Sequence, residues 1–507
     1  MIEQKQITAP DAKRAFFYVF GLTLLIKLWL AASFPMTGDE AYFYLWGKHP
    51  AWGFYDHPPM IGWLMTALMS VSSHPLVLRI VTVLLWCLIA LGMIDLMKRL
   101  APGEEAKAWL LGAVFLTMPF TWALNVVTND TPLILFVFFS AYCYLRAALD
   151  ERLGWYLLAG AWLGLALLSK YFAGLLAVAY FIHFLLAART WHGFRNLLLV
   201  ALAALPFAAI HIAYNATNCW NNIMFNFYNR NESAQFSLLT VVLYLLMMVY
   251  LLTPWVTLRL RRAWPRDKTE LTALLLFAVP FFLFLLLSLK KTVGLHWVLA
   301  FMPFAFLYVA LKIDNAALRR YIGWGAWFSL PHLVVLAAVV LLPVEFWEGR
   351  SAHAGVVFHK NTPQIVAALR QDLPTDAVLM TTSYTPAAIL SFHAGQYIPV
   401  FGVGTHHARQ NDTAADFRQF DGKPVRIFDR SEIDLKQLQP YFASLSLESF
   451  NVAGVQYWYA DGRSFNYAKY REEILSTIAQ RYYRIPDFLP RCGCNFLEKY
   501  GFGEPIR

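Results

Sequence analysis

The fold is decided by the stretch AFFYVFGLTLLIKLWLAASF (residues 15–34) and by PMTGDEAYFY (residues 35–44), which follows it directly. The first segment is apolar and has the length of a membrane-spanning helix, which needs about 20 residues. No clear signal-peptidase site follows it, so we expect it to remain as a span. The second segment then opens a loop with two adjacent acids, Asp39 and Glu40.

The composition extends this interpretation to most of the chain. Of the 507 residues, 58% are hydrophobic and only 15% are charged, whereas a soluble domain carries roughly 25% charged residues. Aromatic residues reach 16%, as in membrane proteins with interfacial belts. A soluble protein is therefore nearly excluded. The net charge of +10 does not require nucleic acid as a partner, because cytoplasmic loops of membrane proteins are rich in Lys and Arg.

Hydropathy predicts a polytopic α-helical membrane protein with eleven candidate spans before residue 342. Most Lys and Arg residues lie in loops on the side of the N-terminus. The short loops of the opposite side carry only Lys48, Lys170, Arg230, Lys290 and Lys291. The asymmetry predicts a cytoplasmic N-terminus, and an odd number of spans then places the C-terminal segment outside.

The C-terminal segment has a different composition. Residues 343–507 are polar and mixed in charge, with β-rich runs at 377–380, 397–400 and 425–428 and helical patterns at 362–370 and 467–480. They predict a small periplasmic α/β domain. We therefore expect two domains: a catalytic membrane domain, residues 1–342, with an outer loop at 35–75, and the soluble domain, 343–507.

The five cysteines fall into two groups, those in expected membrane spans and those in the outer segments. Cys87 and Cys143 lie in expected spans and suit plain core positions. Cys219, Cys492 and Cys494 fall outside, in an oxidising compartment. A bond between Cys492 and Cys494, or from either of them to Cys219, is compatible with the sequence.

The first outer loop carries the acids that we predict to be catalytic. Asp39, Glu40 and Asp56 are embedded in apolar, aromatic sequence, and His57 follows as a substrate-binding candidate. Two carboxylate sites in one loop could supply a general base and a second acidic or metal-binding group. The alternative is a solvated loop in which Asp39 caps a helix. A bound divalent metal is compatible with these acids, but no cofactor is certain.

The other outer loops supply further candidates for substrate binding. These are Asp130, Lys170, Trp220, Arg230, Lys290, Lys291 and His296. Ordinary roles remain open: a helix start at Asp130, snorkelling of Lys170, a plain polar loop around Trp220 and Arg230, and lipid contact for Lys290 and Lys291.

This distribution of charge suits one type of reaction. The acids can activate an acceptor, and the bases can neutralise a phosphate leaving group as its charge develops. A nucleotide sugar would be absent outside the cytoplasm, so a sugar donor should be borne on a lipid. Sugar transfer from a lipid phosphate to a lipid or glycan acceptor follows as the predicted function.

Four motifs carry a family resemblance. They are GDEAY at 38–42, YDHPPM at 55–60, NDTP at 129–132 and LSKY at 168–171. With them the chain resembles the bacterial relatives of protein O-mannosyltransferases and the lipid A aminoarabinose transferase. That resemblance implies the GT-C fold, a bacterial inner membrane, a polyprenyl-phosphate sugar donor and an inverting transfer. The acceptor could be lipid A, its core or another envelope glycan.

The resemblance also bears on single residues. It implies that Asp39 is the essential catalytic carboxylate. The aminoarabinose transferase has Glu-Lys where this chain has Asp56-His57, so the Lys is replaced. The aminoarabinose transferase binds a metal through its acid at that position and a His of a later outer loop. In the corresponding loop this chain has 229-NRN-231 and no His. Bound zinc is therefore not predicted. The alternatives are a flippase for polyprenyl-linked glycans and a protein O-glycosyltransferase.

Overall fold

The computed structural model describes residues 7–123, 125–231, 235–261, 264–490 and 493–503. The chain forms two compact units. Unit 1 contains residues 1–34, 71–209 and 234–338, and unit 2 contains residues 35–70, 210–233 and 339–507. The contacts thus group the first outer loop with the C-terminal segment, whereas the sequence-based division at residue 342 cuts the chain once and stays a prediction.

Unit 1 is helical and encloses one large hydrophobic core. Two of its helices continue into unit 2, α11 (Trp191–Thr217) and α17 (Asn315–Leu341). The others are α1 (Ala9–Ser33), α4 (Pro75–Leu78), α5 (Ile80–Leu100), α6 (Glu105–Leu116), α7 (Pro119–Ala123), α8 (Asp130–Asp150), α9 (Leu153–Leu167), η1 (Tyr171–Ala173), α10 (Gly174–Ala187), α13 (Leu238–Leu252), α14 (Pro254–Leu260), α15 (Lys268–Ser288), η3 (Leu295–Phe301) and α16 (Met302–Ala310).

Six of the described helices are long and apolar enough to cross a membrane, or seven if the bent pair α13–α14 is one span. Shorter apolar helices account for further hydropathic stretches, at Met60–Met69, Leu153–Leu167, Tyr171–Ala187 and Leu295–Ala310. The pair α13–α14 bends by 103° where Pro254, which lacks an N–H donor, begins the second helix. A helical membrane fold is confirmed, and the number of eleven spans stays a prediction.

A buried arginine fixes the end of the first span. Arg79 is 1% exposed, and its Nη1 donates to the carbonyls of Ala31, at 3.0 Å, and Phe34, at 2.7 Å. The last carbonyls of a helix lack partners within it, and a cation there also complements the helix dipole. The transition from α1 to the outer loop is therefore set by this side chain.

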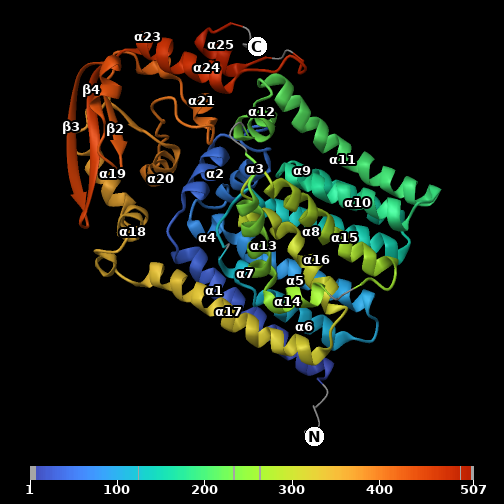
Figure 1. The fold of residues 1–507 in the computed structure, drawn as a ribbon. Helices are drawn as coiled ribbons and strands as arrows, with labels where there is room; N and C mark the ends of the chain where they lie inside the picture. Colours follow the sequence, from blue (N-terminus) through green and yellow to red (C-terminus); the bar gives the residue numbers. More distant parts are fainter. Residues whose placement is uncertain (1–6, 124, 232–234, 262–263, 491–492, 504–507) are drawn as a thin grey trace. The chain divides into compact units, whose positions relative to one another are not determined.

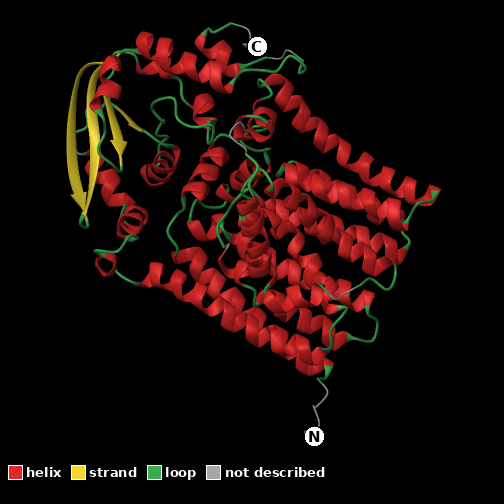
Figure 2. Ribbon diagram, in the orientation of Figure 1, coloured by secondary structure: helices red, strands yellow, loops and turns green. Residues whose placement is uncertain are grey.

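The sheet of unit 2 has the strand order β1-β2-β4-β3. β1 (Val378–Thr381) and β2 (Val425–Asp429) are parallel, and β4 (Val455–Phe465) is antiparallel to both β2 and β3 (Phe442–Val452). β3 and β4 are long strands of 11 residues each, whereas β1 has four residues and β2 five (Figure 1, Figure 2). The parallel pair requires a crossover, which passes through α20 (Tyr384–Ala394).

The strands expected at 377–380 and 425–428 are present as β1 and β2, and the helix expected at 362–370 is α19 (Thr362–Arg370). The run at 397–400 forms only an isolated bridge, from Val400 to Thr381. The helix expected at 467–480 is α23 (Tyr467–Tyr470), a π-turn at Arg471–Leu475 and α24 (Ser476–Tyr482). The β3–β4 hairpin was not predicted, because many of its side chains are exposed.

The remaining helices of unit 2 come from three parts of the chain. They are α2 (Gly38–Lys48), α3 (Met60–Met69), α12 (Asn221–Phe227), η2 (Asn229–Asn231), η4 (Val344–Trp347), α18 (His353–Lys360), α21 (Gln410–Ala414), η5 (Phe417–Phe420), α22 (Leu435–Leu438), η6 (Gln439–Tyr441) and α25 (Asn495–Tyr500). The first turns of α2 and α20 pack closely: a Cβ on Gly38 would lie 2.5 Å from Cγ2 of Thr385. A side chain at position 38 would therefore force Thr385 to shift.

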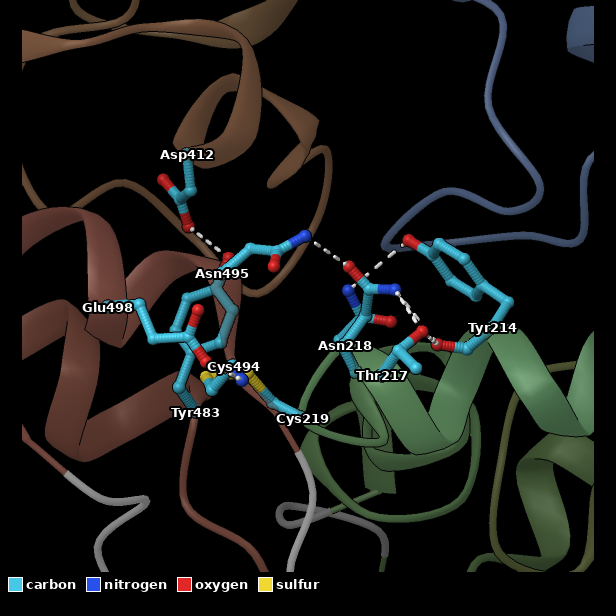
Figure 3. The surroundings of a disulfide bond; sticks show 10 residues. Tyr214, Thr217, Asn218, Cys219, Asp412, Tyr483, Cys494, Asn495 and Glu498 are labelled. Atoms are coloured by element: carbon cyan, nitrogen blue, oxygen red, sulfur yellow. Dashed lines mark hydrogen bonds between the residues drawn. A yellow bond between two sulfur atoms is a disulfide. The ribbon is translucent and has the colours of Figure 1, made fainter.

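A disulfide joins two of these parts. Cys219 is bonded to Cys494 across 275 residues of sequence, with the two Cα atoms 4.7 Å apart. Beside it, Asn495 Nδ2 donates to Asn218 Oδ1 at 2.9 Å, and Glu498 Oε1 accepts from the Cys494 N–H at 3.1 Å (Figure 3). Of the pairings left open by the sequence, this one is present. Cys492 lies outside the described residues.

Cys87 and Cys143 are buried free thiols. This agrees with the core positions that the sequence predicts for them.

We expect loss of the disulfide to destabilise unit 2. The double substitution Cys219→Ser, Cys494→Ser removes a covalent restraint on the unfolded chain, and native disulfides of this kind contribute about 2–5 kcal/mol. The melting temperature of the purified protein in detergent should fall. Reductant should lower the melting temperature of the wild type to that of the double variant, and it should not change the melting temperature of the variant. Equal melting temperatures of wild type and variant without reductant would contradict this role.

Candidate active site

The first outer loop begins with a capped helix. Thr37 is the N-cap of α2, and its Oγ1 accepts from the Glu40 N–H at 3.4 Å. In return, Glu40 Oε2 accepts from Thr37 N at 3.1 Å and from Thr37 Oγ1 at 3.0 Å. This reciprocal arrangement is a capping box, and Glu40 is buried. The cap gives the Glu40 carboxylate a structural task; a catalytic role for it stays a prediction.

Asp39 has a different environment from its neighbour. It lies in the first turn of α2, and its side chain is exposed. The expected alternative, a helix cap at Asp39, does not apply because Thr37 holds that position. The positive end of the helix dipole favours a carboxylate there. Burial raises the pKa of Tyr384, and the Asp39 charge adds to this rise, which places the carboxylate near the start of α20.

Asp56 is buried in unit 2 and held from two sides. The Tyr42 hydroxyl donates to Oδ2 at 2.8 Å, and the Ala408 N–H donates to Oδ1 at 3.1 Å. Both bonds favour the charged carboxylate, yet burial outweighs them and raises its pKa to about 7. Ala408 has a φ of 57°, an unfavourable backbone conformation for a residue with a Cβ. The residue with this strained backbone is the one whose N–H donates to the Asp56 carboxylate.

Amide side chains of residues 221–229 hydrogen-bond to residues 54–56, the segment that contains Asp56. Asn222 Nδ2 donates to the Phe54 carbonyl at 2.9 Å, Asn226 Nδ2 to the Asp56 carbonyl at 3.0 Å and Asn229 Nδ2 to the Tyr55 hydroxyl at 3.0 Å. In the structure, their donors fasten residues 54–56.

The other candidates of unit 2 are placed as follows. Trp220 is 8% exposed in the core of the unit, and its Nε1 donates to the Pro490 carbonyl at 2.9 Å. Its ring is therefore packed inside the unit, and a role in substrate binding stays a prediction. Arg230 is half-buried, with its guanidinium 6.0 Å from the ring centre of Phe225. The half-buried ring of His57 lies 6.3 Å from the same ring.

A buried ion pair that sequence reasoning missed shapes the loop carrying Ala408. Arg409 binds both carboxylate oxygens of Asp412, with Nε–Oδ2 at 2.6 Å and Nη2–Oδ1 at 2.9 Å. Its Nη1 also donates to the carbonyls of Val403 and Thr405. The sequence signal was weak, because Arg and Asp three residues apart are common in exposed loops.

Unit 1 brings three further candidates together. Lys170 Nζ donates to both carboxylate oxygens of Asp130, at 2.8 and 2.9 Å, and both side chains are buried. His296 Nε2 lies 3.7 Å from Asp130 Oδ2, and its side chain is 47% exposed. Snorkelling of Lys170 to the headgroups therefore does not hold. Asp130 starts α8, and its carboxylate joins the turn after α9 to the start of η3.

Lys290 is exposed and Lys291 half-buried, in the turn after α15. Within the described ranges, no three His, Cys, Asp or Glu side chains are gathered as a metal ion requires.

We expect Asp56 to make the stability of unit 2 depend on pH. The folded pKa, about 7, exceeds the ordinary value of 3.8, so the folded state binds this proton more tightly than the unfolded state. The stabilisation is complete below about pH 4 and is lost as the pH rises to about 7. Relative to Asp56→Asn, which stays neutral, the melting temperature of the wild type should fall over this range.

Asp376→Asn, at an exposed position of the same unit, provides the control and should show no such trend. A constant difference between wild type and Asp56→Asn from pH 4 to 8 would refute the assignment.

We expect the Asp130–Lys170 pair to be strongly coupled. Lys170→Met leaves a buried carboxylate without its cation, a change that costs about 3–5 kcal/mol. Adding Asp130→Asn should restore part of the stability, as measured by thermal unfolding in detergent. The exposed pair of Lys469 and Glu473 is the control, where Lys469→Met should have little effect. Additive effects of the two substitutions at 130 and 170 would show that the pair is not coupled.

Comparison with known proteins agrees with this architecture. Residues 56–214 match the family of dolichyl-phosphate-mannose-protein mannosyltransferases. Over 136 residues the chain is 29% identical to the lipid A galacturonosyltransferase RgtD of Rhizobium johnstonii, a match that covers 26% of this chain and 28% of that protein. The chain thus matches little more than a quarter of the length of this relative.

Two crystal structures of ArnT from Cupriavidus metallidurans share the fold over nearly their whole length. The one bound to undecaprenyl phosphate has a TM-score of 0.59 and 15% identity, covering 88% of this chain and 97% of ArnT. The apo form has a TM-score of 0.60 and 14% identity, covering 89% and 98%. These likenesses show that the chain has the fold of ArnT, and the family match over residues 56–214 agrees with the resemblance predicted from the four motifs.

Proposed function

We propose that the protein is an inverting glycosyltransferase that moves a sugar from a polyprenyl phosphate to a lipid acceptor of the cell envelope. Asp39 is the residue that acts on the acceptor. The observation that carries this proposal is the contrast within one helical turn: the Glu40 carboxylate is used in the helix cap, whereas the Asp39 carboxylate is exposed. An exposed carboxylate can meet a substrate that a buried carboxylate held in a helix cap cannot reach.

The donor class is supported by the comparisons. The family matched by residues 56–214 is described by its use of dolichyl-phosphate mannose, and the ArnT structure was determined with undecaprenyl phosphate. A polyprenyl phosphate is therefore the proposed carrier. The name of RgtD, a lipid A galacturonosyltransferase, supports lipid A as the acceptor and galacturonic acid as the first sugar to test.

The chemistry requires few groups. An acceptor oxygen attacks the anomeric carbon, its bond to that carbon forms, and the bond between the carbon and the phosphate oxygen breaks. Asp39 takes the proton of an acceptor hydroxyl, or orients the acceptor if the nucleophile is a phosphate. The leaving polyprenyl phosphate keeps the electron pair, and its negative charge is stabilised by cations.

The cations proposed for the phosphate differ in availability. Lys290 is exposed, and Lys291 and Arg230 are half-buried. Lys170 is already paired with Asp130, so it would have to share its charge with the phosphate. His296 beside this pair is partly open to solvent. We propose that Lys290 and His296 contact the phosphate directly and that Asp130 positions Lys170 and His296.

The proposed orientation follows from the charge distribution. The N-terminus is cytoplasmic and unit 2 lies outside the bacterial inner membrane, where polyprenyl-linked donors and envelope lipids meet. In this orientation the disulfide of unit 2 lies in an oxidising compartment, as such bonds require.

We expect Asp39→Asn to abolish transfer while the protein still accumulates in the membrane. The substitution removes the base and keeps the size of the side chain, and loss of a general base costs about 10²–10⁴-fold in rate. Mass spectrometry of envelope lipids from a deletion strain, complemented with each variant, provides the measurement. Asp11→Asn, in the exposed first turn of α1, is the control and should restore the wild-type pattern.

Full activity of Asp39→Asn would overturn the role of this residue. Glu40→Gln separates the two adjacent acids, because Gln also completes a capping box. Activity near the wild-type level assigns Glu40 to the cap, and a loss like that of Asp39→Asn assigns it to the chemistry. Accumulation of donor that is moved across the membrane but never cleaved would identify a flippase instead.

A further inference from the structure

Unit 2 contains a cavity of about 300 Å³. Its walls come from α2, from residues 51–54, from α20 and from residues 397–414. Every one of these segments belongs to unit 2, so the cavity is a property of that unit. Nothing in the proposed transfer chemistry uses it.

Aromatic and aliphatic side chains dominate the walls. The rings come from Tyr42, Trp46, Phe54, Tyr384 and Tyr397. Trp46 and Phe54 are stacked with their ring centres 4.1 Å apart, and Tyr42 and Tyr384 meet edge to face at 5.7 Å. Contacts of this kind hold the rings in place, so the cavity is preformed.

Small residues of α20 keep the cavity open on one side. Ala387 and Ala388 line it, and larger side chains at these positions would project into the space. Most ligand sites are largely preformed and mainly apolar, with few polar groups. This cavity fits that description.

Several polar groups of the walls are already hydrogen-bonded. The Tyr42 hydroxyl donates to Asp56, and the Tyr397 hydroxyl donates to Asn411 Oδ1 at 2.6 Å. The same Oδ1 accepts from the Val400 N–H at 2.9 Å. A sugar needs a hydrogen-bond partner for each buried hydroxyl, and these groups offer few. A hydrocarbon chain needs none and gains from leaving water.

The cavity adjoins the proposed catalytic acid. Tyr42 lies three residues after Asp39 on α2, so the two share a face of the helix. Tyr384 lines the cavity, and the charge of Asp39 contributes to the raised pKa of this tyrosine. A lipid with its chain in the cavity would thus hold its polar end near the exposed carboxylate.

The volume limits the length of the chain. A volume of about 300 Å³ lies at the lower end of the roughly 300–1,000 Å³ of ligand pockets. The cavity therefore suits a short, unbranched chain or the end of a longer one. A polyprenyl tail is far longer, and its methyl branches widen it.

We propose that this cavity binds a saturated acyl chain of the lipid acceptor and thereby presents the acceptor to Asp39. The inference rests on the proposed glycosyltransferase function and names the part of the acceptor that unit 2 recognises. The sugar-bearing donor is held elsewhere by its phosphate.

The first experiment maps the occupant by photo-crosslinking to the full-length protein in lipid nanodiscs. One probe is dodecyl glucosaminide with a diazirine at the chain end, and the other is farnesyl phosphate with a diazirine at its end. We expect the dodecyl probe to label peptides containing residues 42–54 or 384–414. Labelling of these peptides by the farnesyl probe instead would assign the cavity to the donor, and labelling by neither probe would overturn a lipid site here.

The second experiment fills the cavity. Ala387→Leu should lower crosslinking by the dodecyl probe at least fivefold and raise the KM for an acylated acceptor at least tenfold, with kcat nearly unchanged. Ala394→Leu is the matched control, because it lies on the same helix and does not line the cavity. It should behave as wild type in both assays. Equal crosslinking and equal KM for Ala387→Leu and wild type would overturn the proposal.

Different results would refute the proposed sugar transfer and the proposed acyl-chain site. If the wild-type protein cleaves no polyprenyl-linked donor while the dodecyl probe still labels the cavity, the proposed transfer is wrong and the lipid site remains. If transfer occurs equally well to acylated and to fully deacylated acceptor, the transfer stands and the acyl site is wrong. Melting temperatures of both alanine variants separate a filled cavity from a misfolded unit.

Discussion

The carboxylate of Asp56 is the contact on which unit 2 depends. It joins Tyr42, at one end of the first outer loop, to Ala408, more than 350 positions away in the sequence. A buried carboxylate costs free energy unless it is hydrogen-bonded, and here both of its oxygens accept a bond. Because this contact is specific, the loop that carries Asp39 is held by the C-terminal segment and becomes part of the same compact unit.

Three acids of one loop thereby acquire three different roles. Glu40 completes a helix cap, Asp56 is buried with its pKa raised to about 7 and Asp39 is exposed. Their environments differ although their chemistry is nearly the same. The buried acid has fixed partners that leave it little freedom to approach a substrate, whereas the exposed acid is accessible to solvent. The same reasoning separates Lys170, whose charge is balanced by Asp130, from the exposed Lys290.

Local patterns predicted the parts of the fold that depend on local physics. Apolar length indicates the spans, and β-branched runs indicate β1 and β2, because burial on both faces requires such residues. The β3–β4 hairpin depends on pairing between two partly exposed strands, which leaves a weaker pattern. Long-range contacts leave no such pattern. Examples are the disulfide between Cys219 and Cys494 and the hydrogen bonds of Asn222 and Asn226 to the first outer loop. The sequence around one residue of such a contact does not identify its partner.

These long-range contacts bear on how the role of the C-terminal segment can be learned. Deleting residues 343–507 would remove the Ala408 N–H that binds Asp56, the disulfide partner of Cys219 and most of the cavity wall at once. The Asp39 helix would also lose its packing against α20, where Gly38 approaches Thr385. A loss of activity after such a deletion would therefore not separate acceptor recognition from simple support of the loop. Substitutions that alter one wall of the cavity and leave Asp56 and its two donors in place keep the loop fastened, so only they can assign a binding role to this segment.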